Sequence, residues 1–124
     1  MTATSATPPA LGEPIATRVL DDQSGRGPVT VEIGRPQPWY WEEADRSVYA
    51  CPYRISGGAP DDPGGGDSYA KGIDEMDALT LAVHAIESVL YLWNERLGRQ
   101  LRWTAGHGSW RLSYPSPEPS DRAR

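Results

Sequence analysis

Three side chains in this 124-residue sequence have the chemistry of a nucleophile or an acid–base group: the single cysteine, Cys51, and the two histidines, His84 and His107. A catalytic cysteine requires a neighbouring base and a lowered pKa, and histidine is the usual base. Side chains alternate between faces in an extended chain, so Cys51 in the segment YACPYRI shares its face with Tyr49 and Tyr53. A free cysteine among such neighbours is typical of a packed core, and we predict that Cys51 is buried and inert.

The sequence pattern places neither histidine beside this cysteine. His84 falls near the centre of the polar stripe of a predicted helix, one turn from Glu87, where a surface hydrogen bond is a simpler interpretation than a catalytic dyad. His107 stands at the tip of the loop AGHGS, where function is common, but a turn residue is the simpler interpretation. One cysteine and two isolated histidines match no zinc-binding spacing, so we expect neither a metal nor another cofactor.

The glycine-rich segment SGGAPDDPGGGDSYAKG, residues 56–72, raises the question of a ligand-binding loop. A phosphate-binding loop requires a lysine directly after its glycines, and a calcium-binding loop requires acidic residues at alternate positions and a closing glutamate. The segment meets neither requirement, and we predict a mobile, solvated loop without regular structure. The alternative is a small-molecule pocket between this loop and the sheet, with the ligand-binding residues Tyr53, Arg54, Asp67, His84 and His107.

Charge and hydropathy argue against several classes of function. The formal net charge is −5, and the 12 Lys and Arg residues are scattered without a basic run, so nucleic acid is not an expected partner. No apolar stretch reaches the length of a membrane span, and the first residues, MTATSATPPALGEP, lack the pattern of a secretory signal. A single cysteine fits a reducing compartment, and we expect a cytoplasmic protein.

The periodicity of the apolar residues predicts a two-layer α+β domain. Strands are expected over residues 15–20, 29–33, 48–55, 101–104 and 110–114. Hairpins at both ends favour a mostly antiparallel, five-stranded sheet in the order β-β-β-α-β-β, with one long helix packed on one face. Pro52 predicts that the third strand is an edge strand or carries a bulge. The single domain spans residues 15–114, between disordered tails at 1–14 and 115–124.

The predicted helix begins after Asp74, a good N-cap, and ends at Gly98, a residue suited to the position just beyond a helix. Its core-facing residues recur at steps of three and four, and they are Met76, Leu79, Val83, Ile86, Leu90, Trp93 and Leu97. Leu81, Ala85, Val89 and Leu92 widen the apolar arc beyond this line. We expect that shoulder to be covered by loops or to serve as a dimer or partner surface.

The segment PWYWEE places Trp39, Tyr40 and Trp41 in a row, after prolines that interrupt the strand pattern. Three consecutive side chains cannot all face one core, and Trp and Tyr are typical anchors of protein interfaces. The segment is a candidate partner-binding surface, as is the helix shoulder with Leu81, Ala85 and Leu92. The alternative, which the sequence leaves open, is that the aromatic residues fold over the open face of the sheet.

Four segments together, VTVEIGRPQP, YACPYRI, GIDEMDALTLAVHAI and LRW, carry a resemblance to a known family. The chain resembles a family of small bacterial proteins catalogued as a domain of unknown function, with the motifs VxVxIGRP, CPYRI, GxDxxQALxLAL and GxLxW. The similarity covers residues 15–114, and Asp77 stands where the family often has glutamine. The resemblance implies a single α+β domain, and it brings no activity and no catalytic residues.

These features favour a non-catalytic protein-interaction or accessory factor, of the immunity or antitoxin kind, over an enzyme. The reasons are the acidic charge, the aromatic segment, the wide apolar face of the helix and the lack of a catalytic cluster. We expect a protein partner or a homodimer, and neither nucleic acid nor a membrane. The alternative is a small enzyme or small-molecule-binding protein that uses the glycine-rich loop and His107.

Overall fold

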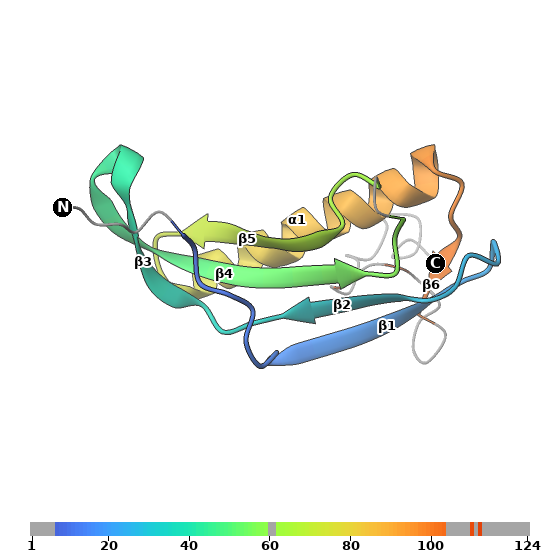
Figure 1. The fold of residues 1–124 in the computed structure, drawn as a ribbon, viewed down its shortest axis with the longest axis horizontal. Coiled ribbons are helices and arrows are strands. Elements are labelled where there is room, and N and C mark those ends of the chain that lie inside the picture. Colours follow the sequence, from blue (N-terminus) through green and yellow to red (C-terminus); the bar gives the residue numbers. More distant parts are fainter. Residues whose placement is uncertain (1–6, 60–61, 104–109, 111, 113–124) are drawn as a thin grey trace, which may run out of the picture.

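The computed structural model describes residues 7–59, 62–103, 110 and 112 of the chain, which form a sheet and a long helix in two layers (Figure 1). The strands are β1 (Ala16–Asp22), β2 (Val29–Ile33), β3 (Gln37–Trp41), β4 (Arg46–Ser56), β5 (Gly66–Gly72) and β6 (Leu101–Arg102). The helix α1 (Glu75–Arg96) lies between β5 and β6 in the chain, and a short 3-10 helix, η1 (Glu42–Ala44), joins β3 to β4. The predicted α+β class, with one long helix on an antiparallel sheet, is confirmed.

The sheet has six strands among the described residues, and two of them were not predicted. Residues 37–41 form β3 in spite of Pro38, which is tolerated because β3 is an edge strand. Residues 66–72, predicted to be loop, form β5 and pair along their whole length with β4, so the partner strand overrides a weak local preference. The predicted closing strand at 110–114 lies outside the described residues, apart from Trp110 and Leu112.

The longest strand, β4, is the centre of the sheet. β5 pairs with one edge of β4, and β3 and β2 pair with different parts of its other edge. Beyond β2, the sheet continues with β1, which pairs with β2, and with β6, which pairs with β1. Between the β2 and β3 pairings, the three residues 34–36 lie opposite only Cys51 and Pro52, which makes a bulge. The carbonyl of Pro52 accepts the Gly34 N–H at 2.8 Å, so the ring nitrogen of Pro52 also faces the bulge. The irregularity predicted at Pro52 is thus a bulge in the opposite segment, residues 34–36; β4 itself carries no extra residue and is not an edge strand.

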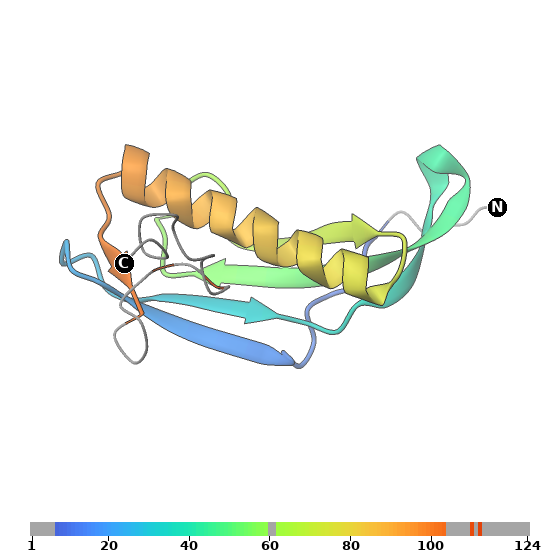
Figure 2. The same cartoon turned by 180° about the vertical axis from the view of Figure 1, so that it is seen from behind.

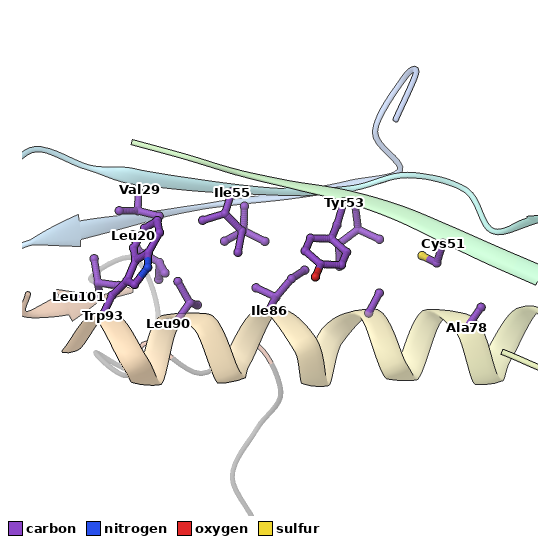
Figure 3. Packing of buried hydrophobic residues seen from close by; sticks show 13 residues of the cluster. Leu20, Val29, Cys51, Tyr53, Ile55, Ala78, Ile86, Leu90, Trp93 and Leu101 are labelled. Atoms are coloured by element: carbon purple, nitrogen blue, oxygen red, sulfur yellow. The ribbon is translucent and has the colours of Figure 1, made fainter. Parts of the chain in front are cut away.

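The core lies between α1 and the sheet (Figure 3), with Trp93, Leu90 and Ile86 of the helix facing Leu20, Val29 and Ile55 of the strands. The line of the helix that faces the sheet is rotated from the predicted one, and its buried residues are Ala78, Ala82, Ile86, Leu90 and Trp93. The prediction for Met76 was wrong, since that side chain is 70% exposed. Small residues explain the rotation: α1 approaches β5 so closely that a β-carbon on Gly72 would lie 2.2 Å from the nitrogen of Ala78.

The ends of α1 are fixed by local hydrogen bonds, as the sequence predicts. The Asp74 carboxylate accepts the Asp77 N–H at 2.8 Å, and the Asp77 carboxylate accepts the Ile73 N–H at 2.8 Å. The arrangement is similar to a capping box, except that the Asp77 carboxylate accepts from the residue before the N-cap Asp74. At the other end, Gly98 follows the C-cap residue and has a φ angle of 72°, a conformation that glycine adopts without strain.

The turn after α1 is tied to the sheet by a buried ion pair. The Arg99 guanidinium is 3.0 Å from the carboxylate of Asp22 at the end of β1, and it donates to the Gly57 carbonyl at 2.9 Å. The other carboxylate oxygen of Asp22 accepts hydrogen bonds from Ser24 and from the Gln100 N–H. Three segments that are distant in sequence are therefore joined at one end of the helix.

The face of the sheet turned away from α1, here called the back face, carries no helix in the described part of the chain (Figure 1). The segment before β1 crosses it, and Leu11 is 7% exposed, lying against Gly34 at the bulge. A disordered tail was expected over 1–14; residues 1–6 lie outside the described residues, and Leu11 is part of the packed structure. Among the described residues, no helix combines the length and the apolar character needed to cross a membrane.

Candidate functional site

Cys51 lies in the core, as predicted from its neighbours in sequence. Its side chain is fully buried on the helix side of β4 (Figure 3), with the sulfur 3.5 Å from the Gly34 carbonyl oxygen. Burial raises the pKa of the thiol from 9.0 to about 11, so the thiolate is scarce at neutral pH. A cysteine in this position has the properties of a packing residue and not of a nucleophile.

We expect Cys51 to resist alkylation by iodoacetamide in the native protein and to react readily in denaturant. The rise of its pKa from 9.0 to about 11 alone makes the thiolate about a hundredfold rarer at neutral pH, and burial denies the reagent access. Mass spectrometry of the alkylated fraction over time, with and without urea, measures the effect. Equal rates in the two conditions would contradict the buried placement.

The residues predicted to line a small-molecule pocket do not converge in the described structure. Tyr53 is 6% exposed and points toward α1 in the core (Figure 3), whereas Arg54 and Asp67 form an ion pair on the back face. His84 lies on the exposed side of α1. His107 lies outside the described residues. The four predicted ligand-binding residues that the structure describes do not line a common pocket.

The glycine-rich loop does border a hollow of about 290 Å³, which includes Arg54 and Asp62 among its lining residues. The polar groups of the loop are engaged in holding it: the Asp62 carboxylate accepts the Ala59 N–H at 2.7 Å and lies 3.7 Å from the Arg99 guanidinium. The Trp93 indole donates to the Pro63 carbonyl at 2.8 Å. The described part of the loop is thus anchored to the core and the helix end.

His84 contributes to a second hollow of about 480 Å³ on the outer side of α1, together with Glu87, Tyr91 and Trp110. The Glu87 carboxylate accepts the Leu112 N–H at 2.9 Å, and the Tyr91 and Trp110 rings lie 6.4 Å apart. These contacts tie the chain after β6 to the helix. Within the described residues, no group of three His, Cys, Asp or Glu side chains is arranged to hold a metal ion.

The two tryptophans of β3 lie on the back face. Trp39 pairs with Val48 and faces away from α1, and its ring meets Tyr69 of β5 edge-on at 5.4 Å. The ammonium group of Lys71 lies 4.0 Å from the Trp41 ring and 5.9 Å from the Trp39 ring. We call Trp39, Trp41, Tyr69 and Lys71 the back-face patch; all four are half-buried.

Only Trp39 and Trp41, half of this patch, could be identified from the sequence. Tyr69 and Lys71 belong to β5, which was predicted to be loop, and they reach the tryptophans across the buried β4 residue Ala50. Tyr40, predicted with the tryptophans, alternates to the other face of β3, where its hydroxyl donates to the Asp45 carboxylate. The stretch DSYAK, which in an extended chain places Tyr69 between Asp67 and Lys71 on one face and the small residues Ser68 and Ala70 on the other, was the signal that could have identified β5.

The helix shoulder is separate from the patch, since α1 covers one face of the sheet (Figure 2) and the strand register directs the patch residues to the other. Ala85 and Leu92 are half-buried and pack against the core, while Leu81 is 41% exposed. The methyl groups of Val89 lie against Gly64 of the glycine-rich loop. Loops therefore cover part of the shoulder, as one of the two alternatives had it.

The sequence model of a family described as Domain of unknown function (DUF6968) matches residues 16–113. The chain belongs to this family. The DUF6968 match begins at β1 and includes the back-face patch, α1 and β6. It confirms the predicted resemblance at the level of a domain of unknown function. No curated protein and no solved structure is significantly similar to this DUF6968 chain.

Proposed function

We propose that this DUF6968 protein is a non-catalytic interaction protein that binds another protein through the back-face patch. The observation that carries the proposal is the meeting of Trp39, Trp41 and Tyr69 on a sheet face that no described helix covers. Trp and Tyr are enriched among the few residues that contribute most of the binding energy at protein interfaces, because they bury large rigid surfaces. Half-buried rings at such a place are suited to complete their burial against a partner.

Charge and the placement of the other candidates support the same proposal. The net charge of −5 favours a basic protein partner, as expected for an accessory factor of the immunity or antitoxin kind. The enzyme alternative has less support, because Cys51 is buried and the predicted ligand residues point to different faces of the sheet and helix.

Replacing Trp39 and Trp41 with alanine is expected to abolish partner capture. Each anchor contributes roughly 2 kcal/mol to binding, which is about a thirtyfold loss of affinity for each side chain removed. The tagged protein and the double variant Trp39→Ala/Trp41→Ala are used to capture proteins from the host of origin. The dissociation constant of the purified binary complex is then measured by calorimetry.

Tyr40→Ala is the matched control, because it removes an aromatic residue from the same strand on the opposite face. It should leave capture unchanged, and circular dichroism should show that both variants are folded. Equal capture by the wild type and a folded double variant would overturn the proposal. Sedimentation of the purified protein alone tells whether the partner is a second copy of the chain.

A further inference from the structure

Resting on the proposed function, we infer that a hollow beside the back-face patch receives an arginine side chain of the protein partner. The hollow is lined by Trp39, Trp41 and Tyr69 and by the two acidic residues Glu42 and Glu43, and its volume is about 260 Å³. Pockets that enclose whole small molecules start at roughly 300 Å³, so this hollow is of the size for one side chain. It is formed where η1 turns the chain back from β3 to β4.

The lining of this hollow is complementary to a cation. Its described residues are three aromatic rings and two carboxylates, and none of them is basic. The Glu43 carboxylate accepts the Trp41 indole N–H at 2.7 Å, which holds the negative charge beside the ring. Aromatic faces attract cations through their quadrupole, and a nearby carboxylate adds a charge-assisted hydrogen bond.

The neighbouring hollow shows that the Trp41 ring accepts a cation, because the chain's own Lys71 lies against it there. Trp41 lines both hollows, and in the neighbouring one the Lys71 ammonium group lies 4.0 Å from its ring, with Arg46 and Asp77 also in the lining. Lys71 is not among the lining residues of the acidic hollow. The acidic hollow therefore presents the same indole together with two carboxylates to a cation from outside.

Arginine fits this site better than lysine. A guanidinium group is planar and stacks on aromatic rings, and its five N–H donors can reach two carboxylates at once. An ammonium group is a compact, strongly hydrated charge that gains less from an aromatic wall. The net charge of −5 would also steer a basic segment of a partner toward the protein.

Nuclear magnetic resonance of isotope-labelled full-length protein tests the inference with the peptide acetyl-Gly-Arg-Gly-amide as titrant. The indole N–H signals of Trp39 and Trp41 should shift and saturate, since Trp41 already donates to Glu43 within the site. The indole signal of Trp93, which donates to Pro63 in the interior, should stay in place. The same peptide with citrulline, a neutral isostere of arginine, should leave all three signals unmoved.

The variant Glu42→Gln/Glu43→Gln removes both charges while keeping the side-chain shapes. Because the two glutamates are exposed, the peptide should bind about five- to tenfold more weakly to this variant. Equal shifts with the arginine and citrulline peptides, or arginine shifts that the double variant does not weaken, would overturn the inference. If tryptophan-dependent partner capture persists in either case, the proposed function stands without an arginine pocket. Partner capture that does not depend on Trp39 and Trp41 refutes the proposed function itself.

Discussion

Replacing Trp93 with alanine should lower the free energy of unfolding by about 3–5 kcal/mol, the range for large aromatic residues in a core. Trp93 is fully buried, and its ring packs beside Leu101 and Leu90 (Figure 3). Its indole N–H donates to the Pro63 carbonyl, and a β-carbon on Gly58 would come within 2.7 Å of the ring. The substitution therefore opens a cavity and also releases the glycine-rich loop from the helix.

Urea unfolding followed by circular dichroism measures this effect. Trp93→Phe, which keeps most of the apolar volume and loses the indole N–H, should fall between the wild type and Trp93→Ala. Glu95→Ala is a control on the same helix, since Glu95 is exposed, and it should change stability by less than about 0.5 kcal/mol. A Trp93→Ala protein as stable as Glu95→Ala would show that the ring does not hold this end of the core.

Replacing Arg99 with alanine should also cost about 3–5 kcal/mol, because it leaves a buried carboxylate without its cation. The side chains of Arg99 and Asp22 are 4% and 0% exposed, so water cannot replace the lost partner without opening the structure. The Gly57 carbonyl would lose its donor as well. Arg35→Ala, at an exposed arginine, should change stability by less than about 0.5 kcal/mol in the same urea measurement.

The same ion pair should make the free energy of unfolding depend on pH in acid. Burial by itself raises the pKa of Asp22, but the hydrogen bonds from Ser24 and Gln100 and the charge of Arg99 outweigh it, and the pKa lies below the ordinary value of 3.8. A carboxyl with a lowered folded-state pKa stabilises the fold above its unfolded-state value and loses that stabilisation as the pH falls through the folded-state value. The stability difference between the wild type and Asp22→Asn should therefore shrink below pH 3.8. A difference that is constant with pH would show that the carboxylate charge contributes nothing.

Elements with strong local signals could be predicted from the sequence, and elements that depend on distant pairing could not. The caps at Asp74 and Gly98 define α1, and the alternation in VTVEI defines β2, because both are properties of neighbouring residues. Six of the residues 57–72 are glycines, which have little preference for a strand; β5 forms because β4 is long enough to pair with it. The rotation of α1 depends on the close packing of Ala78 against Gly72 of β5, which the periodicity of the helix alone does not indicate.

In the candidate site, too, some residues could be identified from the sequence and others depend on contacts between distant segments. Trp39 and Trp41 could be selected from their type and from the impossibility of burying three consecutive aromatic residues in one core. Tyr69 could not be placed with them, because the contact crosses β4 and requires the strand order. The acidic lining is also a product of geometry, since η1 turns Glu42 and Glu43 toward rings that precede them in the chain.

The bulge at residues 34–36 determines which residues of β3, the strand that follows it, face the helix and which face away. In β2 the odd-numbered residues Val29, Val31 and Ile33 face the helix, yet in β3 the odd-numbered tryptophans face away from it. One extra residue in the bulge accounts for the switch, because a one-residue slip exchanges the two faces of a strand. Loss of a single residue here would turn both rings toward the helix side and leave the patch without them. Related chains that keep the patch should therefore change the length of this connection only in steps of two.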